Sequence, residues 1–290
     1  MLKAYSGSNT REHFGGTGRP HERSTYGTDK SGTKSYRFNS LGFRGEEHDA
    51  GAAVTIFVCG CSNAFGTGLN LEETWVHRFK IGYAETHGLD PGEVNVLNFS
   101  QGGASNDYIT RTLLTQCTQV RPDLVIAQFA PMYRAEGFVD GQPYCIGFGC
   151  SPTLSGYGRL LGVPWGTKKT VLRRMWQATG HLRRYSSEGG FADTMRNILL
   201  LQFYCRDAGI PCVMTWSGHE NLDSPAYRDN PALVSLIALV DHSCFCDFAI
   251  RDPDILIDYA ADANHPGPAT NALFAVRLLE FHERATSLSS

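Results

Sequence analysis

Three short polar segments carry side chains that could act together on an ester carbonyl. Ser62 stands in the turn Gly60-Cys61-Ser62, and a serine hydroxyl becomes a nucleophile when a neighbouring base removes its proton. Asp262 and His265 occur in the sequence DANH, a spacing at which one short turn can hold the carboxylate beside the imidazole and orient it. The residue types and their spacing therefore predict a nucleophile and an oriented general base.

Groups that could stabilise a negatively charged oxygen follow a second strand. The run SQGGASN at 100–106 contains paired glycines, which let a backbone N–H approach a substrate oxygen without a side chain in the way. We expect the N–H groups of Ser62 and Gly103 to form an oxyanion hole. The side-chain amide of Asn106 or of Gln128 could supply a further donor, and Asn106 is preferred because it lies in a loop rather than within a strand.

Strands that alternate with helices must bring these segments together. Short apolar runs predict strands, and amphipathic runs with caps and stops predict the helices between them. Such alternation is typical of a parallel sheet covered by helices on both faces, in which ligands bind where loops leave the carboxyl ends of strands. The predicted fold class is α/β, with three α/β/α layers and a sheet of about five strands. The strands are expected at 54–60, 94–99, 124–129, 211–216 and within 248–256. The helices are expected through 75–84 and at 108–120, 193–208, 231–240 and 268–284.

Two segments depart from this rhythm. Residues 1–50 are rich in Gly, Ser and Arg and are interpreted as a segment that wraps over the surface or forms a lead-in, ahead of a main domain at 51–290. Residues 134–190 form a Gly- and aromatic-rich insertion, which favours a lid or binding loop, although a solvated basic face is the alternative. The candidate substrate-binding residues are Gln128, Arg134, Tyr157 and Trp165.

Composition restricts the class of protein and its partners. The 290 residues include 42% apolar residues, and 26 Lys and Arg oppose 29 Asp and Glu, so we expect a soluble globular protein without nucleic acid or membrane as a partner. The start of the chain lacks the apolar core of a secretory signal, which predicts a cytoplasmic location. Nine scattered cysteines indicate reduced, buried thiols such as Cys59, Cys205 and Cys212, and no metal site is expected.

Together the motifs resemble the SGNH (GDSL-type) hydrolases over about residues 54–284. Gly60-x-Ser62 matches the family's nucleophile block, Asn98 to Gly103 its oxyanion-glycine block, and Asp262-x-x-His265 its terminal block. The stretch NSLGFRG at 39–45 is similar to a lead-in that many such domains carry. The resemblance implies a flavodoxin-like fold and a serine esterase mechanism without a cofactor. The expected reaction is removal of an acyl group, most plausibly acetyl, from a carbohydrate or other small polar metabolite.

The sequence departs from the family pattern at two places and leaves alternatives open. Cys61 replaces the usual Asp before the nucleophile, and Gln128-Phe129-Ala130 stands where the family often has an oxyanion asparagine. Cys61 itself could act as a thiol nucleophile with His265. The same residues could also serve an O-acyltransferase, or the domain could be a catalytically weakened glycan-binding module. The sequence sets neither the acyl group nor the oligomeric state.

Overall fold

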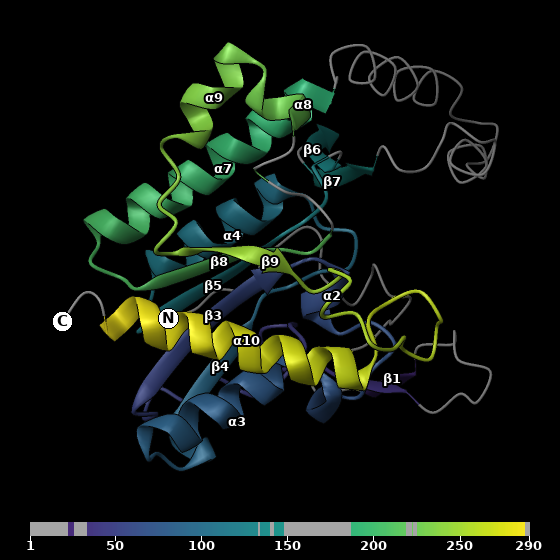
Figure 1. Ribbon diagram of the computed structural model, residues 1–290. Helices are drawn as coiled ribbons and strands as arrows, with labels where there is room; N and C mark the ends of the chain where they lie inside the picture. Colours follow the sequence, from purple (N-terminus) through teal and green to yellow (C-terminus); the bar gives the residue numbers. More distant parts are fainter. Residues whose placement is uncertain are drawn as a thin grey trace.

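A parallel five-stranded sheet forms the centre of the protein. The computed structural model describes residues 23–25, 34–132, 134–139, 142–147, 187–218, 222 and 225–287 (Figure 1). Within them the strands lie in the order β4-β3-β5-β8-β9, with bounds β3 Val54–Gly60, β4 Val94–Asn98, β5 Leu124–Phe129, β8 Cys212–Trp216 and β9 Phe245–Ala249. All four neighbouring pairs are parallel, so the carboxyl ends of all five strands lie along one edge.

Helices cover both faces of this sheet (Figure 1). On one face α4 (Asn106–Cys117) packs against α7 (Ser187–Asp207), and on the other α3 (Trp75–His87) packs against α10 (Pro268–Ser287). Alternate residues of the central strands supply two separate apolar cores, with Phe57 and Val125 on the α4 side and Ile56 and Ile126 on the α3 side. The predicted three-layer α/β/α fold is therefore confirmed.

The order of the strands fixes where a ligand site is expected. Counted along the chain, the five strands are arranged 2-1-3-4-5, which is the flavodoxin-like order. Chain connections leave in opposite directions from its first and third strands, β3 and β5, and this point of reversal opens a crevice at their carboxyl ends. Ser62 follows β3 immediately, so the candidate nucleophile lies at the place that the topology favours.

Several predicted boundaries differ from the structure. Helix α4 begins earlier than expected and is capped by Ser105, whose hydroxyl accepts a hydrogen bond from the N–H of Tyr108. Strand β9 starts three residues before the predicted range, because its sequence FCDFA mixes apolar and charged residues and lacks the apolar run of a covered strand. Helix α7 starts six residues early, and α9 (Pro231–Ile237) ends three residues early. A short α8 (Pro225–Arg228) precedes α9.

The predicted irregular insertion begins with regular structure. Strands β6 (Arg134–Val139) and β7 (Gln142–Gly147) pair as an antiparallel hairpin. The rest of the insertion, from 148 to 186, lies outside the described residues. The prediction of a lid and the alternative of a solvated basic face both concern that part of the chain.

Several side chains of the lead-in segment are packed into the protein. Strand β2 (Ser35–Arg37) pairs with β1 (Arg23–Thr25), and the side chains of Tyr36, Phe38 and Arg44 are at most 2% exposed. Tyr36 and Phe38 form a third apolar cluster with Phe65, which comes directly after the nucleophile turn. Residues 36–44 are thus part of the support of the candidate site.

Asp258 caps the beginning of α10, the helix that follows the terminal motif. Its carboxylate accepts hydrogen bonds from the N–H groups of Ala269 and Thr270 and from the Thr270 hydroxyl, at 2.8–3.0 Å. Burial alone would raise the pKa of Asp258, but these hydrogen bonds outweigh it and hold the pKa below its ordinary value of 3.8. Asp258 therefore stays ionised and caps the helix that begins three residues after His265.

Replacing Asp258 with alanine is expected to lower the free energy of unfolding by about 1 kcal/mol, the usual cost of losing a helix cap. Because the pKa is lowered in the folded state, this contribution is complete above the unfolded pKa of about 3.9 and disappears as the pH falls through the folded value. Urea unfolding at pH 7 and at pH 3 measures both effects. Asp254→Ala is the control, since Asp254 is exposed in the same loop. An equal loss in both variants, or one unchanged by acid, would contradict the assignment.

Candidate active site

Close packing at Gly60 creates the turn that presents Ser62. A Cβ atom at Gly60 would lie 2.7 Å from the Cβ of Ala64 and 3.1 Å from that of Gln128, so only glycine lets the chain fold back this tightly against β5. The turn continues as the single-turn helix α2 (Ser62–Phe65), which ends at Gly66 with a φ of 78°. Asn98, at the end of β4, donates to the carbonyl of Ala64 at 2.8 Å. The strand ends on both sides thus fix the turn.

Cys61 and Asn63 point away from the position expected of a nucleophile. The Cys61 sulfur lies 2.9 Å from the hydroxyl of Ser217, and Cys61 is 1% exposed. Asn63 donates to the carbonyl and to the hydroxyl oxygen of the same Ser217, which follows β8. These contacts bridge the loops after β3 and β8. They leave Cys61 buried and without access to a substrate, which favours Ser62 as the nucleophile.

Ser62 and the terminal motif supply the reactive groups. Ser62 is half-buried, and neither its hydroxyl nor its N–H is hydrogen-bonded to any residue that the structure describes. Asp262 accepts from the backbone N–H groups of Asn264 and His265 at 3.0 and 2.9 Å, and its other oxygen lies 2.5 Å from Nδ1 of His265. The predicted contact between Asp262 and His265 is therefore present.

The state of Asp262 determines which nitrogen of His265 can act as a base. Burial would raise the pKa of Asp262, but the hydrogen bonds from the backbone and side chain of His265 and from Asn264 outweigh it and lower the pKa below 3.8. An ionised carboxylate can only accept hydrogen bonds, so Nδ1 of His265 carries the proton. When the imidazole is neutral, Nε2 has the lone pair, and Nε2 makes no hydrogen bond within the described part of the chain.

Gly68 connects the nucleophile turn to the terminal motif. A Cβ atom at Gly68 would lie 2.9 Å from the Cβ of Ala260 and 3.5 Å from the carboxylate of Asp262. The loop that follows α2 therefore passes directly against Asp262. No hydrogen bond joins Ser62 to His265 in the described chain. In unliganded sites such contacts are often long and tighten when substrate binds.

The loop after β4 brings Gly103 to the same edge of the sheet. Gln101 donates its N–H to the carbonyl of Gly60 at 3.1 Å, and Ala104 donates to the carbonyl of Gln101. Gly103, between them, has a φ of 79°, a conformation that glycine adopts without strain. Its N–H has no hydrogen-bond partner among the described residues. The N–H groups of Ser62 and Gly103 are thus both available as donors.

Neither of the two candidate amide donors is placed to reach a substrate oxygen. Asn106 donates both amide hydrogens, to the carbonyl of Ala130 and to the hydroxyl of Thr194, and its oxygen accepts from the Ala130 N–H. Its amide is used to attach α4 to β5 and α7. Gln128 is 0% exposed, so it does not contact solvent or a substrate, although its amide atoms have no partner among the described residues. We therefore leave both out of the oxyanion hole.

The remaining substrate-binding candidates are only partly placed. Arg134 begins β6 and donates to the carbonyl of Ala104 at 3.3 Å, so it braces the loop that carries Gly103. Tyr157 and Trp165 lie outside the described residues. Of these three candidates, only Arg134 is therefore placed beside the candidate site.

Replacing Gly68 with alanine is expected to lower kcat about a hundredfold, since displacing a catalytic group by about 1 Å has effects of that size. The added methyl group would push against Ala260 and Asp262. Gly88→Ala is a matched control, because Gly88 also has a positive φ, of 67°, but has open space around it. Hydrolysis of a small acetate ester by each variant gives the comparison. Similar losses in the two variants would show that backbone strain alone is responsible.

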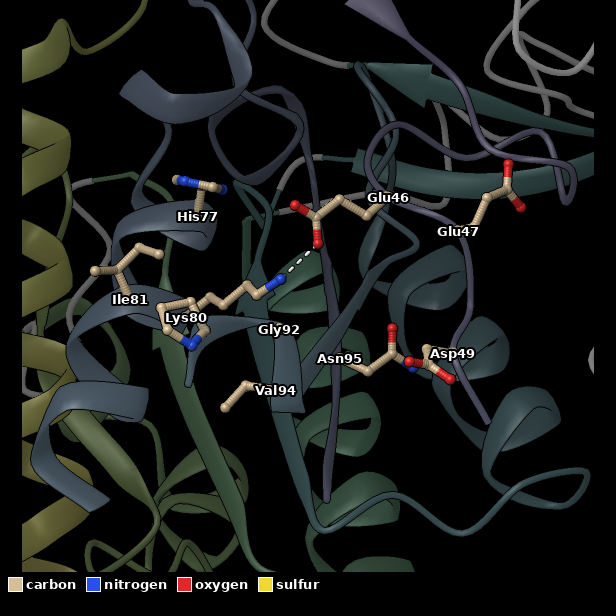
Figure 2. A pocket seen from close by; sticks show the side chains of 10 residues that line it. Glu46, Glu47, Asp49, His77, Lys80, Ile81, Gly92, Val94 and Asn95 are labelled. Atoms are coloured by element: carbon tan, nitrogen blue, oxygen red, sulfur yellow. Dashed lines mark hydrogen bonds and ion pairs between the residues drawn. The ribbon is translucent and has the colours of Figure 1, made fainter. Parts of the chain in front are cut away.

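The cavity in Figure 2 lies elsewhere and is not the candidate site. It has a volume of about 340 Å³ and is lined by His77 and Lys80 of α3 and by Val94 at the beginning of β4. The Lys80 amine is already paired with Glu46 at 2.5 Å, as the dashed line shows. None of the reactive groups lines this cavity, which adjoins the amino end of β4 rather than the carboxyl ends of the strands.

The described residues hold neither a metal-binding cluster nor a membrane-spanning helix. No group of three or more His, Cys, Asp or Glu side chains there is arranged to hold a metal ion. No helix there is long and apolar enough to span a membrane. Cys59 and Cys205 are buried free thiols as predicted, whereas Cys212 is only partly buried.

Sequence reasoning missed the residues that support the nucleophile turn. Arg44 and Tyr36 both contact the loop after α2, through hydrogen bonds to its carbonyls and to the N–H of Gly68. The lead-in motif at 39–45 was the available signal, but a motif does not show which loop its arginine reaches. Ser217 was missed because it follows β8 with no distinguishing neighbour in the sequence.

No family model matches the chain, and no curated protein does. Among solved structures it is similar to esterase EstA from Pseudoalteromonas sp. (13% identity, 80% of this chain and 98% of that one, TM-score 0.42). It is also similar to the acetylxylan esterase Axe2 from Geobacillus stearothermophilus (12%, 81% and 96%, TM-score 0.41). A two-domain esterase active on acetylated mannans is matched over 51% of its own length (13%, 82% of this chain, TM-score 0.44). These similarities are too distant to carry a functional conclusion.

Proposed function

We propose that this protein is a serine esterase that removes an acyl group, in the first instance acetyl, from a hydroxyl of a carbohydrate or another polar metabolite. One observation carries the proposal. An ionised Asp262 orients His265 with Nε2 unpaired, at the edge of the sheet where the Ser62 hydroxyl and the N–H groups of Ser62 and Gly103 also have no partner in the described chain.

The first half-reaction forms an acyl-enzyme. The Ser62 hydroxyl attacks the ester carbonyl while Nε2 of His265 takes its proton, and Asp262 stabilises the resulting imidazolium. The N–H groups of Ser62 and Gly103 donate to the oxyanion of the tetrahedral intermediate. When this intermediate collapses, His265 returns the proton to the leaving alcohol. This step requires Ser62 and Nε2 to approach within about 2.6–3.2 Å in the substrate complex.

The second half-reaction releases the acyl group to water. His265 again acts as the base, now on a water molecule that attacks the acyl-enzyme, and Ser62 recovers its proton. If an alcohol replaces the water, the same groups perform acyl transfer. Two backbone donors, without an amide from Asn106 or Gln128, form a sparser oxyanion hole than one with a third donor. The loss of one such donor costs about 2.7–4 kcal/mol of transition-state stabilisation in a serine hydrolase.

Covalent labelling tests the proposal directly. The full chain is incubated with a fluorophosphonate probe and its intact mass is measured, in parallel with hydrolysis of p-nitrophenyl acetate and of an acetylated xylan. We expect a single adduct and release of acetate from both esters. Labelling with acetyl transfer to an added alcohol, but little hydrolysis, would favour the acyltransferase. A folded protein that neither reacts with the probe nor cleaves either ester would refute the esterase and favour a binding module.

A further inference from the structure

Arg44 is a buried cation whose hydrogen bonds all go to one loop. Its guanidinium donates to the carbonyls of Phe65 and Gly66 through Nη1, at 2.7 and 2.6 Å, and to that of Leu69 through Nη2 at 2.7 Å. Arg44 is 2% exposed, and it forms no ion pair with a carboxylate of the described residues. A buried charge without a direct ion pair is costly, although the carboxylates of Glu72 and Glu73 attract the guanidinium from beyond ion-pair distance.

The surroundings of Arg44 compensate for its burial. The guanidinium lies 4.2 Å from the ring centroid of Tyr36 and 5.2 Å from that of Phe65, and aromatic faces attract cations. Burial lowers the pKa of Arg44 from 12.5 to about 10, so the side chain is still charged at neutral pH. The three carbonyls come from the end of α2 and the loop beyond it, where helical partners are lacking, and that of Gly66 also accepts the N–H of Leu69 at 3.2 Å.

Hydrogen bonds within the lead-in segment itself also help to hold Arg44 in position. Asn39 accepts hydrogen bonds from the N–H groups of Leu41 and Phe43. Phe38 and Arg44 form an antiparallel bridge across this turn. The arginine therefore projects from a short, internally bonded turn, which limits the freedom that its long side chain would otherwise lose.

The loop to which Arg44 donates its hydrogen bonds runs from the Ser62 turn to the Asp262–His265 pair. At one end it continues from α2, whose first residue is Ser62. At the other end Gly68 lies against Asp262, and the Gly68 N–H donates to the Tyr36 hydroxyl at 2.7 Å. A shift of this loop would change the separation of Ser62 from the Asp262–His265 pair.

We infer that Arg44, assisted by Tyr36, is a positioning residue for the proposed esterase: it fixes the loop at 65–69 so that Ser62 and the Asp262–His265 pair face each other. This role rests on the proposed function. It differs from a general contribution to stability, because it predicts that the chemical step suffers more than substrate binding does when the contact is lost.

The test compares Arg44→Met with a matched arginine elsewhere. Arg121 donates to the carbonyls of Ala208 and Gly209, at the end of α7, at 2.6 and 2.7 Å. It thus also donates to two carbonyls after a helix, at the opposite edge of the sheet near the amino end of β8, but Arg121 is exposed whereas Arg44 is buried. For Arg44→Met, Arg44→Lys and Arg121→Met, the rate of fluorophosphonate labelling, kcat and KM for p-nitrophenyl acetate, and the Tm are measured on the full chain.

For Arg44→Met we expect kcat and the labelling rate to fall about a hundredfold, with KM within threefold of wild type. Arg44→Lys, which keeps the charge but not the fork of donors, should recover at least tenfold of that loss. Arg121→Met should lower the Tm but leave kcat unchanged. If Arg44→Met does not fold, Arg44→Lys decides, and its kcat should then lie about tenfold below wild type with KM unchanged.

Three results would overturn the inference. These are wild-type kcat in a folded Arg44 variant, a rise in KM with kcat unchanged, and losses in the Arg44 and Arg121 variants that follow the Tm alike. Each leaves the esterase proposal intact as long as the wild-type protein is labelled. A wild-type protein that is neither labelled nor active would instead remove the proposed function itself.

Discussion

Replacing Ser62 with alanine is expected to abolish fluorophosphonate labelling and to lower kcat by about a millionfold, the loss seen when a serine nucleophile is removed from a complete catalytic triad. The reason is structural. Cys61, the neighbouring nucleophile, is buried and lies against the Ser217 hydroxyl, so it cannot substitute for Ser62 without unfolding of the turn. Residual turnover would come from substrate binding and the backbone donors alone.

The control for this prediction is Cys61→Ala, which removes the only other nucleophile of the turn. We expect it to keep the adduct and most of the turnover, with some loss of stability because the contact with Ser217 disappears. Peptide mapping of the adduct in wild type should place it on Ser62. An adduct that survives in Ser62→Ala and is lost in Cys61→Ala would exchange the serine mechanism for a thiol one.

Replacing Asp262 with asparagine is expected to lower kcat about ten-thousandfold at neutral pH while KM changes little. An amide at this position could donate to Nδ1 of His265, which would move the imidazole proton to Nε2 and leave no lone pair facing Ser62. It would also fail to stabilise the imidazolium. Steady-state hydrolysis of p-nitrophenyl acetate measures both constants, and His265→Ala should be at least as damaging.

Asp254→Asn is the control for Asp262→Asn, since Asp254 is an exposed carboxylate in the segment between β9 and α10 and should keep wild-type activity. The low pKa of Asp262 adds a further expectation. Because its carboxylate stays ionised below the ordinary range of aspartate, protonation of Asp262 should not limit activity as the pH falls through about 4. Near-normal kcat in a folded Asp262→Asn variant would move the role of orienting the base to another residue.

The strands could be predicted where a local run of apolar residues marks them. The strands at 54–60 and 124–129 are continuous apolar runs, and both lie in the centre of the sheet. The hairpin of β6 and β7 could not be predicted in the same way, because Gly137 and Pro143 interrupt its pattern. Apolar runs identify covered strands, but they say little about a hairpin outside the main sheet.

In the site, too, contacts within one turn could be predicted from the sequence, whereas contacts between distant elements could not. The contact between Asp262 and His265 spans one turn, so its spacing predicted it correctly. The role of Asn106 depends on Ala130 and Thr194, which come from two other elements, and no local pattern indicates that its amide is already used. Arg44 is part of the motif NSLGFRG at 39–45, but only the fold shows that its guanidinium reaches the loop beyond Ser62.

Two contacts at and near the site join segments that lie far apart in the chain. Gly68 meets Asp262 across almost two hundred residues of chain, and Asn271 of α10 accepts the N–H of Trp75 at the start of α3 over a similar span. Closing such long loops precedes the gain from the contacts they make, so contacts of this kind form slowly. We therefore expect covalent reactivity at Ser62 to return late when the unfolded chain refolds.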